Sequence, residues 1–475
     1  MEQKLISVGI DVGTSTTQVI FSRLSMSDKG GFFSVPKADI VSREIIYRGG
    51  IHETPLVSPE TIDAEALTSL VNADFAKAGF AGGGVDTGAV IITGESARKE
   101  NARAVLEHLS GLAGDFVVST AGPDLEAVIA GRGSGAAEWS RKNNGRAVNL
   151  DIGGGTTNIA VFENGEDRAA GSLDVGGRVI RIAGGKIRSV SAAAAAVAAW
   201  KGMGIAVGDP ADEKILGRVC GAMAEVLDMA MGFRKRESIF ETLRTSGSAY
   251  FAIPAKPDGI FLSGGVADAV YTAHDDAFAY GDIGVLLGRA LRQSALCTRS
   301  RLLRGGETIR ATVVGAGSYT VNLSGSTIFY RGNVFPLKNL PVLRLSDAEE
   351  RACYRGENGP LADRMVWFLS QHDTKLPALA FAGERNPGYG ELNAAAGVFA
   401  RTAAAVLGQG VPLVIVTEQD TAKALGQLIS VRLEENRPLA VLDSIHAGDH
   451  TYIDVGMPLM GGIAAPVVIK TLIFG

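Results

Sequence analysis

Two stretches of the chain carry nearly the same short pattern, far apart in the sequence. Residues 11–21 read DVGTSTTQVIF and residues 151–162 read DIGGGTTNIAVF. In each copy an apolar run reaches an aspartate, a turn of glycine and threonine follows, and a second apolar run begins, which predicts strand, tight turn, strand. A repeat at this spacing indicates duplicated domains rather than a solenoid. The chain is therefore expected to contain two related halves.

The rest of the chain alternates between strand-like and helix-like segments, which is typical of an α/β fold. The pattern of the first half restarts near residue 146, and a third section begins near residue 331. With 475 residues the chain is long enough for two to four domains. We predict domains at residues 1–145, 146–330 and 331–475. Within the second, RATVVGAGSYTV is interpreted as a strand that ends in a Gly-Ala-Gly turn.

The two turns are suited to holding a polyphosphate. Their glycines, hydroxyls and consecutive backbone amides form a concave donor surface for phosphate oxygens. Each turn also begins with one carboxylate, Asp11 or Asp151. Because carboxylates repel phosphates, a hydrated Mg²⁺ between them is expected; Mg²⁺ combines one or two carboxylates with substrate phosphates. The alternative is that each turn is only a tight hairpin.

A third glycine-rich element follows a predicted strand at residues 260–270, IFLSGGVADAV. Ser263, Gly264 and Gly265 stand at the end of that strand, where glycines allow backbone to lie against a base or ribose. Taken alone, this pattern is common and nonspecific.

The order of these elements resembles the actin–hexokinase–heat-shock-70 superfamily. The two turns are similar to its two phosphate motifs, IFLSGGVADAV to its adenosine motif, and AGPDLEAVIAG and VVGAGSYTV to its two connecting helices. The resemblance implies duplicated actin-like ATPase (RNase H-like) domains around a nucleotide cleft, followed here by a C-terminal α/β domain.

Over its full length the chain resembles the ethanolamine ammonia-lyase reactivating factors of bacterial ethanolamine utilisation. The segments GAVIITGESARKENAR, IRATVVGAGSYTVNLSGSTI and YIDVGMPLMGGIAAPVVIKTL carry this likeness into the C-terminal section. It implies a chaperone-like ATPase that uses ATP and Mg²⁺ to release damaged cobalamin from ethanolamine ammonia-lyase, so that intact adenosylcobalamin can enter.

The resemblance also implies roles for individual residues. Asp11 and Asp151 would hold the magnesium. The phosphates would meet Gly13, Thr14, Ser15, Thr16 and Thr17 on one side and Gly153, Gly154, Gly155, Thr156 and Thr157 on the other. Ser263, Gly264 and Gly265 would meet the adenosine.

One position departs from the superfamily pattern. Heat-shock-70 ATPases usually carry Glu-Pro before the first connecting helix, whereas this chain has Gly122-Pro123. Glu126, one turn into the helix, or Glu95 in ITGESA is expected to orient the attacking water; otherwise hydrolysis is slow. A simpler interpretation of Glu126 is that it favours the helix N-terminus.

Composition excludes several classes of protein. The net charge of −5 argues against a nucleic-acid partner. Six arginines between residues 289 and 310 indicate a solvated helix face or a docking surface for an acidic protein. Three scattered cysteines are typical of a cytoplasmic protein, and the apolar C-terminal stretch is too interrupted to predict a membrane span. Association with the ethanolamine microcompartment is implied by the resemblance alone, and a homodimer is left open.

Two rival functions remain within the superfamily. A small-molecule kinase would need a catalytic aspartate in a substrate cleft, and a filament-forming actin-like ATPase would polymerise with ATP. The segment DSIHAGDH at residues 443–450 does not fit the cobalamin motif D-x-H-x-x-G, and its two histidines cannot complete a zinc site.

Overall fold

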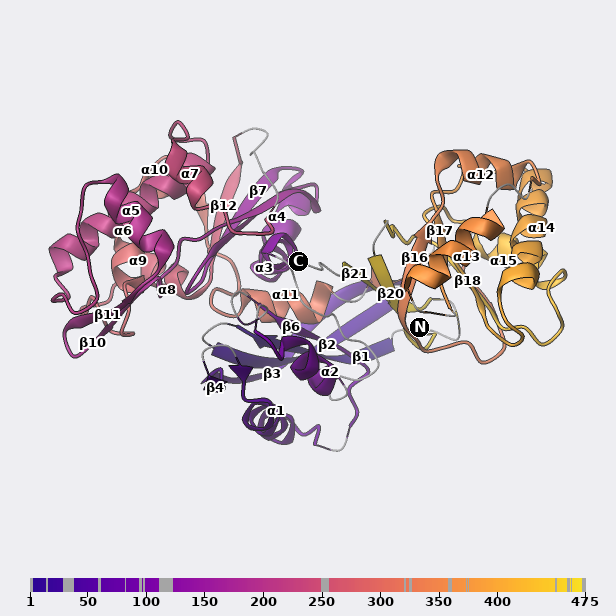
Figure 1. Ribbon diagram of the computed structural model, residues 1–475, viewed down its shortest axis with the longest axis horizontal. Helices are drawn as coiled ribbons and strands as arrows, with labels where there is room; N and C mark the ends of the chain where they lie inside the picture. The colour runs from indigo at the N-terminus through magenta and orange to yellow at the C-terminus, as the bar shows by residue number, and fades with distance from the viewer. Residues whose placement is uncertain are drawn as a thin grey trace.

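The computed structural model describes residues 3–13, 16–28, 38–58, 61–81, 83–93, 96, 99–110, 123–248, 256–319, 322–323, 327–357, 361–372, 374, 376–448, 451–458, 462 and 464–471. It has three parts, coloured from indigo through magenta to orange and yellow in Figure 1. Within the described residues no helix is long and apolar enough to cross a membrane.

The first part is built on a mixed sheet in the order β3-β2-β1-β6. β1 is antiparallel to β2 and parallel to β6. Its elements are β1 (Gln3–Val12), β2 (Thr16–Asp28), β3 (Ala38–Glu53), β4 (Leu56–Ser58), β5 (Thr61–Ile62), α1 (Ala64–Ala78), β6 (Thr87–Ile92), α2 (Ala102–Ser110), α3 (Pro123–Gly133) and α4 (Ala136–Asn143). The strand predicted before α3 lies outside the described residues.

The second part repeats this strand order, as β13-β12-β7-β8-β9. β7 is antiparallel to β8 and parallel to β12. Its elements are β7 (Arg146–Ile152), β8 (Thr157–Glu163), β9 (Glu166–Leu173), β10 (Ile180–Ala183), β11 (Lys186–Val190), α5 (Ala192–Trp200), α6 (Glu213–Ala230), α7 (Ser238–Thr242), β12 (Gly259–Ser263), α8 (Gly265–Tyr271), α9 (Gly284–Gln293), α10 (Ala295–Thr298), β13 (Leu302–Leu303) and α11 (Ala311–Tyr319). The two halves thus share one core strand order and equivalent hairpins.

The third part is an α/β domain around an eight-stranded sheet in the order β14-β21-β20-β16-β17-β18-β19-β15. Its elements are β14 (Asn322–Leu323), β15 (Phe329–Arg331), β16 (Leu337–Arg344), α12 (Asp347–Tyr354), α13 (Leu361–His372), β17 (Ala378–Phe381), α14 (Tyr389–Val406), β18 (Leu413–Thr417), α15 (Ala422–Ser430), β19 (Leu439–Leu442), β20 (Thr451–Val455) and β21 (Pro466–Thr471). β16 to β19 run parallel in chain order. The sheet takes in β14, which precedes the predicted boundary at residue 331.

The connecting helices α3 and α11 cross between the two halves, at the centre of Figure 1. α3 belongs to the first half in sequence but packs on β7, β8 and β9, whereas α11 packs on β1, β2 and β6. Glycines allow the crossing: a Cβ at Gly133 would lie 1.8 Å from the carbonyl oxygen of Ala311, and one at Gly315 would lie 2.0 Å from that of Ile129. The prediction of a strand at residues 310–321 is wrong, because Ala311–Tyr319 is helical.

This crossing leads to a prediction about stability. We expect Gly133→Ala or Gly315→Ala to lower the free energy of unfolding by about 1–3 kcal/mol or more, the usual range for overpacking, because backbone atoms block the added methyl. Gly217→Ala in α6 is the control: nothing lies within 4 Å of its Cβ position, so alanine should raise stability by about 0.5–1 kcal/mol. Chemical denaturation measures the free energy of unfolding of each variant. If the Gly133 or Gly315 variant is as stable as Gly217→Ala, the close approach of α3 and α11 is contradicted.

Candidate functional site

The two hairpins have the same register and the same turn. β1 and β2 pair Asp11 with Gln18, and β7 and β8 pair Asp151 with Asn158. In each turn the glycine amide donates to the carbonyl three residues later: Gly13 to Thr16 at 2.9 Å, and Gly153 to Thr156 at 2.9 Å. The two motifs are therefore equivalent in structure as well as in sequence.

The first turn is held by hydroxyl groups from later segments of the first half. Thr93, directly after β6, donates to Asp11 Oδ1 at 3.0 Å. Thr54 and Ser96 donate to the carbonyl oxygen of Gly13 at 2.8 and 3.0 Å. Thr16 is half-buried and Thr17 is buried. Thr14, Ser15 and Glu95 lie outside the described residues.

The second turn is buried more deeply. Asp151 is only 6% exposed and accepts hydrogen bonds from Ser263 Oγ at 2.6 Å and Thr312 Oγ1 at 3.4 Å. The carbonyl oxygens of Gly153 and Gly154 accept from the amides of Gly177 and Arg178 at 3.0 and 2.6 Å. Because both carbonyl oxygens are already hydrogen-bonded to the segment at residues 177–178, the conformation of the turn from Gly153 to Thr157 is fixed.

The two carboxylates influence each other across the halves. Burial raises the pKa of Asp11 to about 7; the bond from Thr93 opposes this shift, and the negative charge of Asp151 adds to it. Burial also raises the pKa of Asp151, against the bonds from Ser263 and Thr312. Two buried acidic groups, one of which is destabilised in its ionised form by the charge of the other, are suited to a shared cation. Among the described residues no group of three or more His, Cys, Asp or Glu could hold a metal, so phosphates and water would complete the shell.

The third glycine motif contacts the second hairpin directly. Gly264 has φ +85°, and a Cβ there would lie 2.4 Å from the carbonyl oxygen of Ile152. Its amide donates to the carbonyl of Thr308 at 3.1 Å. By contrast, the nearest atom to a Cβ on Gly265, where α8 begins, is 4.0 Å away. Ser263, Gly264 and Asp151 therefore lie close together.

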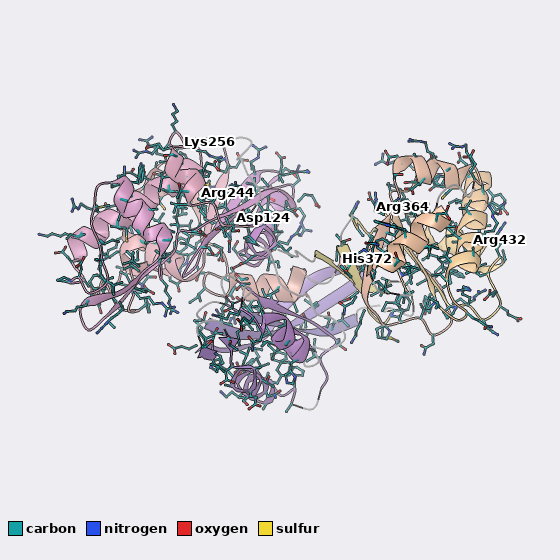
Figure 2. All side chains as sticks on the ribbon, in the orientation of Figure 1. Asp124, Arg244, Lys256, Arg364, His372 and Arg432 are labelled. Carbon is teal, nitrogen blue, oxygen red and sulfur yellow. The ribbon has the colours of Figure 1, made fainter. Side chains whose placement is uncertain are left out.

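The first turn of α3 carries two acids, Asp124 and Glu126, both half-buried. Asp124 accepts a hydrogen bond from Ser248 Oγ at 2.7 Å. Arg244 donates to the carbonyl of Ser248 at 3.2 Å, and Figure 2 labels Asp124 and Arg244 on these adjoining segments. Asp124 therefore contacts the second half through Ser248.

Sequence reasoning missed Thr93, Thr312 and Asp124. Thr312 reaches Asp151 only because α11 crosses the halves, and no local pattern indicates that. Five of the six arginines between residues 289 and 310 have internal partners; Arg301 and Arg304 lie over the rings of Trp139 and Tyr271, and the other three form polar contacts. Arg289 pairs with Glu213 at 2.7 Å, Arg292 donates to the carbonyl of Ala269 at 2.7 Å, and Arg310 donates to that of Gly49 at 3.0 Å.

The contact at Gly264 provides a matched test. We expect Gly264→Ala to destabilise the protein and to weaken binding of a fluorescent ATP analogue by at least about tenfold, because the methyl would push the motif away from Ile152 and positive φ strains alanine. Gly221→Ala in α6, where nothing lies within 4 Å of the Cβ position and which lies outside the three glycine motifs, should bind the analogue like wild type. Denaturation and fluorescence titration report both; equal binding by both variants would contradict this assignment of the motif.

Known proteins match this chain over nearly its whole length. The family described as "Ethanolamine utilisation protein EutA" matches residues 3–475. Proteins named "Ethanolamine ammonia-lyase reactivase EutA" from Salmonella typhimurium and Escherichia coli are each 36% identical, covering 99% of both chains. A solved Ppx/GppA family member from Aquifex aeolicus covers 67% of this chain and 98% of its own, with 14% identity and a TM-score of 0.41. The chain belongs to the EutA family of ethanolamine utilisation proteins.

Proposed function

We propose that this protein is a Mg²⁺-dependent ATPase that reactivates ethanolamine ammonia-lyase by releasing damaged cobalamin from it. The observation that carries the proposal is the pair of equivalent hairpins, whose carboxylates act on each other across two halves joined by crossing helices. The names of its relatives from Salmonella typhimurium and Escherichia coli, which are ethanolamine ammonia-lyase reactivases, support the choice of partner.

Different residues bind the magnesium, the phosphates and the adenosine of the nucleotide. Asp11 and Asp151 hold a hydrated Mg²⁺, which neutralises phosphate charge. The backbone amides and hydroxyls of the two turns, at residues 13–17 and 153–157, bind the phosphates. Ser263 positions Asp151 through its 2.6 Å hydrogen bond, and Gly264 and Gly265 leave room for the adenosine.

A water molecule must be directed at the terminal phosphate for hydrolysis. Glu126 and Glu95 are the candidates, since Gly122 stands where the superfamily usually carries glutamate. The residue that orients water is the one whose amide variant loses ATP turnover while it still binds nucleotide. If both amide variants turn over ATP normally, neither of them has this role.

Nucleotide binding is coupled to the partner by a change in the angle between the halves. A nucleotide that contacts both hairpins favours the closed arrangement, and hydrolysis removes part of that preference. The partner is released only if it binds the two arrangements with different affinity. This work takes place in the cytoplasm, in association with the ethanolamine microcompartment.

The proposal predicts the outcome of a reconstitution. Ethanolamine ammonia-lyase inactivated during turnover should regain activity when this protein, ATP, Mg²⁺ and fresh adenosylcobalamin are added. Asp151→Ala should fold, as shown by circular dichroism, but lose ATP turnover and reactivation, because the carboxylate between Ser263 and Thr312 is gone. EDTA should abolish reactivation by the wild type.

Three results would contradict this account. The first is no recovery of the lyase in a mixture where ATP is hydrolysed. The second is full turnover by Asp151→Ala. The third is phosphorylation of a small substrate or ATP-dependent sedimentation of polymers without any reactivation, which would indicate a kinase or a filament-forming protein.

A further inference from the structure

Several carboxylates gather at one edge of the C-terminal sheet. β17, β18 and β19 run parallel, so their carboxyl ends meet at the same edge, where open α/β sheets bind ligands. Glu418 and Asp420 follow β18, Asp443 follows β19, and Glu350 reaches the end of β17 from α12. This edge is remote in sequence from the hairpins.

Two of these carboxylates, Glu350 and Glu418, already have hydrogen-bond donors or basic side chains beside them. Glu350 accepts from the amides of Gly383 and Ala382 at 2.8 and 3.2 Å. Glu418 pairs with Arg344 at 2.8 Å and with His446 at 3.1 Å. They therefore have no need of a further ligand.

Asp443 and Asp420 differ from them. Asp443 is 0% exposed, and its Oδ1 is buried without a hydrogen-bond partner. Thr327 Oγ1 lies within hydrogen-bond distance of Asp420 Oδ1, at 2.7 Å, and also of Asp443 Oδ2. One hydroxyl hydrogen cannot serve two carboxylates. Within the described part of the chain, neither acid forms an ion pair.

A second buried oxygen lies beside the pair in sequence. Thr421 occupies the N-cap of α15 but its side chain makes no capping hydrogen bond. Its Oγ1 is buried and without a partner, although the residue is only 9% exposed. Unpartnered oxygens of an acid and a hydroxyl are costly to bury unless something else binds them.

We propose that Asp443 and Asp420, which Thr327 bridges, bind a divalent cation at this edge of the sheet. Both offer hard oxygen ligands, and Mg²⁺ and Mn²⁺ accept one or two carboxylates with water in the remaining positions. Asp420 is exposed, which leaves the water-bearing side open. Thr327 would be held by the same site through its bonds to both carboxylates.

The competing arrangement is a pair of acids that shares a proton. Burial, together with the neighbouring Asp420, raises the pKa of Asp443 to about 7. A shared proton leaves one of the two acids neutral, whereas a cation would bind both in their ionised form.

The position of Thr327 gives the site a structural consequence. Thr327 lies between β14 and β15 of the C-terminal sheet. A bound cation would therefore tie Thr327, just before β15, to the ends of β18 and β19.

The test uses full-length protein, without nucleotide, and Mn²⁺ as the probe. An Asp11→Asn, Asp151→Asn background removes the carboxylates of the nucleotide cleft. Electron paramagnetic resonance of free Mn²⁺ should show one ion bound per chain, displaced by excess Mg²⁺. Adding Asp443→Asn or Asp420→Asn should weaken binding by at least about tenfold, the loss expected even for residues that only support a metal ligand.

Glu350→Gln is the matched control, since its carboxylate is satisfied by two amides, and it should leave Mn²⁺ binding unchanged. Asp420 is exposed, so its variant remains informative if Asp443→Asn does not fold. The proposal is overturned if the background variant binds no Mn²⁺, or if adding Asp443→Asn or Asp420→Asn leaves Mn²⁺ affinity as it is in the background variant. Reactivation by the wild type is measured separately, so either proposal can fail alone.

Discussion

The arrangement of the two halves depends on the crossing of α3 and α11. Each helix is connected in sequence to one half and packs on the sheet of the other. Ile129 of α3 and Ala316 of α11 share a small buried cluster with Ala89 and Ile91 of β6. Gly133 and Gly315 bring the two backbones together. Without this crossing, Thr312 could not reach Asp151, and the hairpins would have no fixed relation to each other.

Apart from the helices, a short segment before α11 contacts the first half with polar groups. Glu307 pairs with Arg48 at 2.8 Å, Arg310 donates to the carbonyl of Gly49 at 3.0 Å, and Gln18 donates to the carbonyl of Ile309 at 3.4 Å. Exposed ion pairs contribute little to stability, typically below about 1 kcal/mol. Such contacts would oppose a rotation of the halves only weakly.

Local pattern was enough to predict the hairpins and the glycine motif. An aspartate at the end of an apolar run, followed by glycine and threonine, specifies the turn through short-range hydrogen bonds such as Gly13 to Thr16. The family resemblance predicted a connecting helix at VVGAGSYTV, residues 313–321, whereas the valines and threonines of this segment favoured a strand. The helix forms because Gly315 must approach α3 closely, and tertiary packing outweighs intrinsic preference. Thr93, Thr312 and Asp124 come from distant segments, so only the folded chain shows their role.

The proposed function requires the two halves to close on one nucleotide. Spin labels at Asn72→Cys on α1 and Lys214→Cys on α6, both exposed positions on opposite halves, allow the distance to be measured by double electron–electron resonance. The account predicts a shorter distance when Mg²⁺ and a non-hydrolysable ATP analogue are added, and no shortening in an Asp151→Asn background. A distance distribution that is unchanged by nucleotide in the otherwise wild-type protein would contradict it.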